Sequence, residues 1–189
     1  MANFIGVVGS DRPESFNQQA LALLEGSLHQ SDHTVDRLLL ADPTLPIYTQ
    51  ITEADVGQPT QVTQFRESIK KADGLLFACP EYNGLMPPAL LNGLTWATRS
   101  PTAQADLSPF ALKPCFIASS SPGSLGGIRA ASQLANYLIG LGALVYPQFF
   151  LIANAYQVFD PSKPEALQAF QQKAESLSLE FARFCQAGN

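Results

Sequence analysis

The sequence predicts an α/β protein with a five-stranded parallel sheet and helices on both faces. Short, strongly apolar segments alternate with longer segments in which apolar residues recur at helical spacing. This alternation continues along the whole chain, and repeated strand–helix units form parallel sheets through right-handed crossovers. A length of 189 residues suits one domain with a substantial core. We therefore expect a single domain over residues 1–189.

The strands are predicted from short apolar runs. The segment 74–79 is continuously apolar, as expected for a strand that helices cover on both faces. The predicted strands are residues 4–8, 35–40, 74–79, 114–119 and 143–152. In open parallel sheets, ligands bind beyond the carboxyl ends of the strands. The loops that follow the first, third and fourth strands are therefore the segments to inspect for a binding site.

The helices are predicted from apolar residues spaced three and four apart. The last one carries Leu167, Phe170 and Phe181 on one face, and the third begins at Pro88, which suits a first helical turn. The predicted helices are residues 15–30, 62–72, 88–99, 125–141 and 164–186. Two long connections remain between these elements, and we interpret them as loops over residues 41–60 and 100–112.

The composition excludes several classes of function. The net charge of −5, with no cluster of lysine or arginine, predicts no nucleic-acid partner. No apolar stretch reaches the roughly 20 residues that cross a bilayer, and the start of the chain shows no signal peptide. Cys79, Cys115 and Cys185 are interpreted as reduced thiols, which predicts a cytoplasmic location. His29 and His33 lie outside any ligand spacing, so we expect neither a metal site nor a Ser–His triad.

The loop after the first strand carries groups that suit a phosphate. Free N–H groups and the helix dipole favour an anion at a helix N-terminus, and Arg12 can add a charge-assisted contact. The candidate residues are Ser10, Arg12, Ser15, Phe16 and Asn17. Neither the dinucleotide fingerprint nor the P-loop pattern occurs here, so a single phosphate without magnesium is predicted. The alternative is that Ser15 serves merely as the N-cap of the helix.

The loop after the third strand suits a flat ligand. Asparagine and glycine adopt unusual backbone angles, which allows a ring to lie against exposed backbone amides with Tyr82 near its edge or face. The candidate residues are Pro80, Glu81, Tyr82, Asn83 and Gly84. The alternative is a plain turn with an aromatic anchor.

The loop after the fourth strand is rich in small residues, which would let a ring approach the backbone closely. Ser124 is not a nucleophile elbow, because Pro122 stands where that motif needs glycine. The candidate residues are Ser119, Ser120, Ser121, Gly123, Gly126 and Gly127. A flexible Gly/Ser connection is the alternative for this loop taken alone. Three such loops, each after the appropriate strand, together favour a binding site.

These loops resemble those of the NADPH-dependent FMN reductase family, a flavodoxin-like group that includes quinone, azo-dye and chromate reductases. The family motif Gly-Ser-x-Arg-x-x-Ser-x-Asn is matched from Gly9 to Asn17, and Pro-Glu-Tyr-Asn-Gly is matched without a gap at residues 80–84. Supporting matches are Leu90, Asn92, Trp96, Gly126, Gly127, Arg129 and Ala130. The resemblance covers about residues 4–152.

The resemblance implies a flavodoxin-like three-layer sandwich with strand order 2-1-3-4-5. It also implies an FMN-binding oxidoreductase that transfers a hydride from NADPH or NADH to FMN, and on to a small acceptor such as free flavin or a quinone. No catalytic side chain is expected, because flavin N5 carries the hydride chemistry.

The resemblance also assigns roles within the site. Ser10, Arg12, Ser15 and Asn17 would hold the phosphate. Residues 80–84 would line the isoalloxazine, with the backbone amides of residues 82–84 near its polar edge and N5. The 119–127 loop would cover the pyrimidine side through backbone N–H groups, whose dipoles stabilise negative charge on reduced flavin.

Some residues depart from the family pattern. Asp11 stands where the family usually has an apolar residue, and we expect its side chain to point outward. Leu91 and Thr95 replace a lysine and an aspartate, which indicates a lost ion pair. Arg99 and Arg129 are candidates for contact with the 2′-phosphate of NADPH, for which no fingerprint occurs.

Three rival functions remain open. One is a quinone, azo or metal-ion reductase whose FMN stays bound. A second is a flavodoxin-type electron carrier without its own NAD(P)H oxidation, although the third loop lacks the aromatic residue that such carriers use. The third is a relative that binds no flavin, which the intact first loop argues against.

The predicted helices 88–99 and 125–141 are apolar around most of their circumference. A helix that covers one face of a sheet normally has a polar outer stripe. Charged residues make up 14% of the chain, against about 25% in a typical soluble domain. We therefore expect a homodimer, or a dimer of dimers (a homotetramer), through these helices, with the 41–60 loop of the partner, and its Tyr48, near the flavin. The alternative is that the loops 41–60 and 100–112 cover the helices within one chain.

Overall fold

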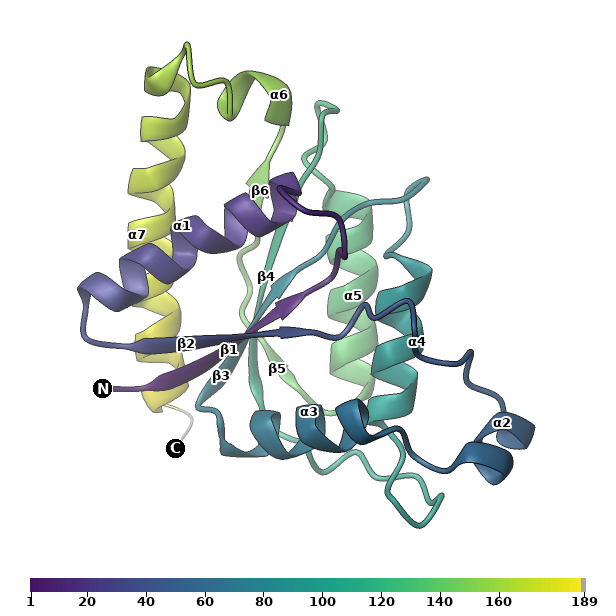
Figure 1. The fold of residues 1–189 in the computed structure, drawn as a ribbon. Coiled ribbons are helices and arrows are strands. Elements are labelled where there is room, and N and C mark those ends of the chain that lie inside the picture. The colour runs from purple at the N-terminus through teal and green to yellow at the C-terminus, as the bar shows by residue number, and fades with distance from the viewer. Residues whose placement is uncertain (188–189) are drawn as a thin grey trace.

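The computed structural model describes residues 1–187. Its sheet is parallel throughout, in the order β2-β1-β3-β4-β5, with β6 also paired to β4 (Figure 1). The predicted order is confirmed. The strands are β1 (Asn3–Val8), β2 (Thr34–Leu39), β3 (Gly74–Ala78), β4 (Pro114–Ser120), β5 (Leu144–Val145) and β6 (Phe150–Ile152).

The fifth strand, predicted to be continuous over residues 143–152, is interrupted. Between the two ladders β4 advances three residues, from Cys115 to Ala118, while its neighbour advances five, from Val145 to Phe150. The edge strand therefore bulges between β5 and β6, where Pro147 lacks an N–H for the ladder. The prediction of one uninterrupted strand was wrong because it gave no weight to this proline.

The helices form two layers, one on each face of the sheet (Figure 1). α1 and α7 cover one face, and α3, α4 and α5 cover the other. Five helices match predicted ones within a few residues: α1 (Phe16–Gln30), α3 (Thr60–Lys71), α4 (Pro88–Ala97), α5 (Ile128–Gly140) and α7 (Pro164–Ala187). Two short helices, α2 (Gln50–Val56) and α6 (Ala155–Val158), were not predicted.

The long segment before α3 folds over α4 of its own chain. The indole N–H of Trp96 donates to Pro46 O at 2.8 Å, and the Asn92 amide bonds both Pro46 O and the Tyr48 N–H. Tyr48 packs edge-on against Trp96, with ring centroids 5.1 Å apart. Tyr48 and the segment around it therefore pack on α4 of their own chain. The expected place of Tyr48 near the flavin of a partner stays a prediction.

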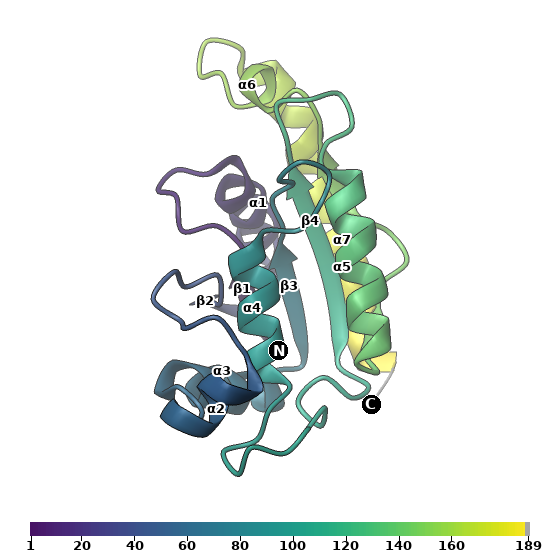
Figure 2. The ribbon, with the colours of Figure 1, turned by 90° about the vertical axis from the view of Figure 1, so that its right-hand side faces the viewer.

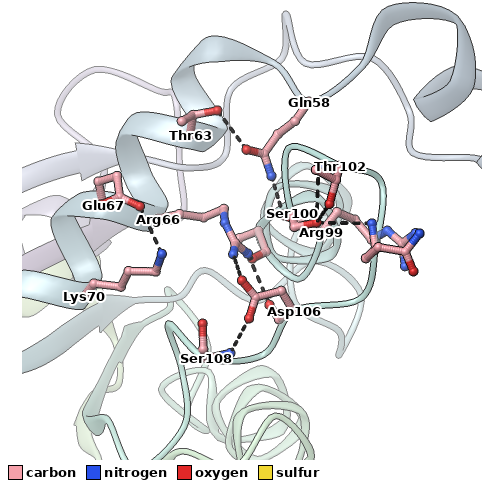
Figure 3. A network of polar contacts seen from close by, with 12 residues as sticks. Gln58, Thr63, Arg66, Glu67, Lys70, Arg99, Ser100, Thr102, Asp106 and Ser108 are labelled. Carbon is pink, nitrogen blue, oxygen red and sulfur yellow. Dashed lines mark hydrogen bonds and ion pairs between the residues drawn. The ribbon is translucent and has the colours of Figure 1, made fainter.

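A polar network fastens the chain after α4 to α3, at the end of α4 opposite its ligand loop (Figure 3). The Arg66 guanidinium is buried and bonds the carbonyl of Ala97 and the carboxylate of Asp106. Gln58 donates to the carbonyl of Arg99, whose own guanidinium pairs with the buried carboxylate of Glu53 at 2.8 Å. Arg99 is thereby committed to a structural ion pair.

Among residues 1–187, none of the helices combines the length and the apolar character needed to cross a membrane.

Two helical glycines give a matched test of this packing. A Cβ at Gly93 in α4 would lie 2.4 Å from Leu40 O, whereas a Cβ at Gly26 in α1 would meet nothing within 4 Å. We expect Gly93→Ala to lower the free energy of unfolding by about 1–3 kcal/mol through overpacking. Gly26→Ala should raise it by about 0.5–1 kcal/mol, because alanine favours a helix. Urea titration measures both, and equal effects would contradict the close approach of α4 to Leu40.

Candidate functional site

The three loops singled out in the sequence lie at the same end of the sheet, because the carboxyl ends of parallel strands share one edge (Figure 1). They enclose a cavity of about 180 Å³. The residues that line it are Ser10, Arg12, Ser15, Phe16, Asn17, Pro80, Glu81, Tyr82, Ser120, Ser121, Pro122 and Tyr156. The remaining candidates are outside this lining: Ser119 lies near the end of β4, and Asn83, Gly84, Gly123, Gly126 and Gly127 lie in the loops themselves.

The first loop presents hydrogen-bond donors to the cavity. Ser15 is the N-cap of α1, and its hydroxyl oxygen accepts the N–H groups of Asn17 and Gln18. A hydroxyl that accepts through its oxygen still has a proton to donate, so the capping role leaves Ser15 able to bind an anion. The Phe16 N–H has no acceptor in the described part of the chain, as expected for the first turn of a helix.

Arg12 differs from Arg99 and Arg129, the other two arginines that the sequence offers as phosphate ligands. Within residues 1–187 its guanidinium makes no ion pair, and its Cζ lies 5.9 Å from the centre of the Phe16 ring. Arg99 and Arg129, by contrast, pair with Glu53 and Glu81. The cavity therefore has one guanidinium that is free to bind an anion.

Asn17 acts as a clamp between the first and third loops. Its side-chain amide donates to Ser120 O at 2.9 Å and accepts the Ser120 N–H at 2.8 Å, and both residues are buried. Both polar atoms of the amide thus have a backbone partner. Asn17 lines the cavity and also fixes α1 against the carboxyl end of β4.

The second loop forms a tight hairpin turn. Tyr82 and Leu85 exchange backbone hydrogen bonds of 2.9 and 3.0 Å, and Asn83 and Gly84 between them have φ values of 54° and 84°. Two central residues with positive φ define a type I′ turn, for which Asn-Gly is the preferred pair. The Tyr82 N–H is used within the turn, so of the three amides expected near the flavin only those of Asn83 and Gly84 remain free in the described residues.

The carboxylate of Glu81 binds the free N–H groups at the N-terminus of α5. Its carboxylate accepts the backbone N–H groups of Arg129 and Ala130 at 3.1 and 3.3 Å and pairs with the Arg129 guanidinium at 2.9 Å. The bonds from Arg129 and Ala130 hold the pKa of this carboxyl below its ordinary value. Glu81 therefore ties the second loop to the third, and Arg129 is occupied in that contact.

The third loop packs tightly on β4. The Ser119 hydroxyl is buried and donates to Cys79 O at 2.6 Å, and a Cβ at Gly127 would lie 2.0 Å from that hydroxyl oxygen. Gly127 has a φ of 83°, so both its backbone and its contact with Ser119 require glycine. Ser119 thus supports the loop from beneath. The N–H groups of Ser124 and Leu125 have no acceptor in the part of the chain described.

Two lining residues were missed in the sequence. Tyr156 lies in α6, directly after β6, and Pro122 lies inside the third loop. The sequence carried a signal for Tyr156, because the fifth predicted strand ends at the same edge of the sheet as the others.

Cys79 directly precedes the second loop, and burial raises the pKa of its thiol to about 12, which leaves it protonated and unreactive.

The family model for NADPH-dependent FMN reductases matches residues 2–157 of this sequence. The chain belongs to this family. An NAD(P)H-dependent FMN reductase of Pseudomonas aeruginosa is 35% identical over 93% of this chain and 92% of its own length. A quinone reductase of Escherichia coli strain K12 is 33% identical over 77% of this chain and 74% of its own.

The fold is shared with solved structures. FerB, a flavoenzyme NAD(P)H:(acceptor) oxidoreductase of Paracoccus denitrificans, superposes with a TM-score of 0.74. The alignment covers 97% of this chain and 98% of that one, at 23% sequence identity. The fold is flavodoxin-like, as predicted.

Glu81 provides a test of how the loops are tied together. Glu81→Gln removes the charge that holds Arg129, and we expect the free energy of unfolding at pH 7 to fall by about 1 kcal/mol, since Arg129 is largely exposed. The folded-state pKa of Glu81 is lowered, so its stabilisation is complete above the pKa of an unfolded glutamate, about 4.3. This stabilisation is lost as the pH falls through the folded-state pKa.

The difference between wild type and Glu81→Gln should therefore be constant from pH 7 to 5 and shrink on further acidification. Urea titrations at several pH values measure it. Glu67→Gln is the matched control, because Glu67 forms an exposed ion pair with Lys70 in α3 and should contribute little. A difference that persists unchanged into strong acid would contradict the role of the Glu81 charge.

Proposed function

We propose that this chain binds FMN in the cavity between its three ligand loops and works as an oxidoreductase that takes electrons from NADPH or NADH. The electrons pass to a small acceptor such as a quinone or free flavin. Family membership supports the reaction class. The observation that carries the assignment is the set of unpaired donors at one end of the cavity, next to the N-terminus of α1.

The residues present fit a phosphate at that end. Among the described residues Arg12 has no carboxylate partner, Ser10 and Ser15 supply hydroxyls, and Phe16 supplies a free N–H at the N-terminus of α1, the positive end of the helix dipole. Asp11 is exposed and does not line the cavity, so its carboxylate is not among the groups that would meet the phosphate. A terminal phosphate monoester satisfies these donors, whereas an uncharged end does not.

The second and third loops, next to the cavity, carry backbone amides that suit the polar edge of a flat ring. Within residues 1–187, the N–H groups of Asn83 and Gly84 in the second loop and of Ser124 and Leu125 in the third have no acceptor. Such fixed backbone dipoles stabilise negative charge without reorganisation. Asn17 and Glu81 take no part in proton transfer in this proposal, and they hold the loops at a fixed spacing.

When bound, FMN supplies the atom that accepts and later delivers a hydride, so the protein needs no side-chain base. The task of this chain is to orient two planar reactants and to keep the phosphate end anchored. The buried thiol of Cys79 takes no part in the reaction, because its raised pKa keeps it protonated.

Three further points stay predictions: a cytoplasmic location, a single domain over residues 1–189 and the choice between NADPH and NADH.

Assembly is part of the proposal. Large apolar side chains remain exposed on and beside α4 and α5, which cover the same face of the sheet (Figure 2). They are Leu85, Leu91, Leu125 and Ile139. A symmetric contact would bury this set twice, and we propose a homodimer, or a dimer of dimers, through these helices.

The proposed function is tested first with wild-type protein. We expect the fluorescence of FMN to be quenched when it binds, and riboflavin to bind more weakly than FMN. We also expect NADPH or NADH to be oxidised steadily when a quinone is added. Riboflavin binding as tightly as FMN would contradict the phosphate assignment. Flavin binding without NAD(P)H oxidation would instead favour an electron carrier.

Arg12→Ala removes the unpaired cation of the cavity. Charge-assisted hydrogen bonds are worth roughly 1.5–3 kcal/mol, so the Kd for FMN should rise about tenfold or more. The melting temperature without flavin should hardly change, because Arg12 is exposed. Asp11→Asn is the matched control and should leave the Kd within about twofold, since a surface charge outside the cavity is screened. An unchanged Kd in Arg12→Ala would refute the assignment of Arg12.

Light scattering at micromolar concentration tests assembly. The chain mass is 20.3 kDa, and we expect a particle of about twice or four times that mass. Leu91→Glu on α4 should shift it toward the monomer by placing a charge in an apolar contact. Leu112→Glu is the matched control: it replaces an exposed leucine outside both helices and should leave the particle mass unchanged. A wild-type monomer would rule out the dimer.

A further inference from the structure

The short helix α6 (Ala155–Val158) is attached to the third ligand loop. The Asn154 N–H donates to Gly123 O, and the Ala155 N–H donates to Ser121 O, both at 3.1 Å. Asn154 adopts a left-handed conformation with a φ of 52°, which turns the chain sharply after β6. Because of these bonds, the position of Tyr156 is set by the same loop that forms one wall of the cavity.

Aromatic contacts then join Tyr156 to the first ligand loop. The rings of Tyr156 and Phe16 meet edge to face, with centroids 5.0 Å apart and an interplanar angle of 90°. Phe16 also stacks on Phe159 at 5.6 Å, and the Arg12 guanidinium lies 5.9 Å from the centre of the Phe16 ring. Edge-to-face and stacked pairs are favoured arrangements. Phe16 therefore places Tyr156 and Arg12 on the same end of the cavity.

The hydroxyl of Tyr156 has no partner within residues 1–187, whereas those of Tyr48 and Tyr146 donate to Glu53 and Glu180. The side chain is 69% exposed yet lines the cavity. A phenol hydroxyl is a hydrogen-bond donor, and donors to charged acceptors are the strong ones. Tyr156 thus adds an unused donor to the cavity wall beside Phe16 and Arg12.

We propose that Tyr156 is a phosphate-binding residue of the flavin site, which donates its hydroxyl to the terminal phosphate of FMN and so strengthens the preference for FMN over riboflavin. The inference rests on the proposed function. It makes α6, which follows β6, a fourth element of the site. The residue is held for this role by Phe16 on one side and by the third loop on the other.

The test compares Tyr156→Phe with wild type in titrations of flavin fluorescence with FMN and with riboflavin. Tyr156→Phe keeps the ring and its contact with Phe16, and removes the hydroxyl alone. We expect the Kd for FMN to rise about tenfold, and the Kd for riboflavin to change less than about twofold, because riboflavin has no phosphate to accept the bond. Tyr146→Phe is the matched control: it removes a hydroxyl bonded to Glu180 outside the cavity and should leave both values unchanged.

The outcomes separate this inference from the proposed function. If wild-type protein does not prefer FMN to riboflavin, both the proposed phosphate site and this inference are wrong. If wild type prefers FMN and Tyr156→Phe binds it equally well, the inference alone is wrong. An equal loss for both flavins would also overturn it, since the hydroxyl would then serve the ring or the ribityl chain rather than the phosphate. The melting temperature of each variant without flavin checks that the fold is intact.

Discussion

The reciprocal pair of hydrogen bonds between the Asn17 amide and the backbone of Ser120 is the contact on which the site depends. It joins two segments that lie 103 residues apart in the chain, and it is buried on both sides. A buried amide with one satisfied donor and one satisfied acceptor has few alternative arrangements, because any shift would leave a polar atom without a partner. The N-terminus of α1 and the carboxyl end of β4 are therefore held at one spacing.

A second contact of the same kind holds the ring end of the site. Glu81 joins the second loop to the first turn of α5, where its charge also meets the positive end of the helix dipole. Since Glu81 occupies that helix terminus, an anionic ligand is left with the N-terminus of α1. The loops thus differ in what they offer: the first carries charged and hydroxyl donors, and the second and third carry neutral backbone amides. This difference suits a molecule that carries a phosphate on one side and a polar ring edge on the other.

Glycine makes the close contacts between these loops possible. Gly127 lies over the Ser119 hydroxyl, and a Cβ at Gly9 would meet Ala78 O at 2.5 Å. The first and third loops can approach the sheet this closely because no side chain intervenes. The bulge at Pro147 has a comparable effect on the edge strand, since it separates β5 from β6 and leads the chain into α6 beside the cavity.

The sequence by itself determined the fold class, the strand order implied by the resemblance, and the three loops that meet at the carboxyl edge, because apolar periodicity and local motifs are short-range properties. It also located the type I′ turn residues Asn83 and Gly84, although not that this turn consumes the Tyr82 N–H. The tertiary structure alone decided which side chains remain free. Arg99 and Arg129 found carboxylate partners far away in the sequence, Ser119 was buried beneath Gly127, and Tyr48 packed on Trp96 of its own chain. Tyr156 entered the site through contacts with Phe16 that no local pattern encodes, because partners distant in sequence are chosen by packing and by the need to satisfy buried polar groups.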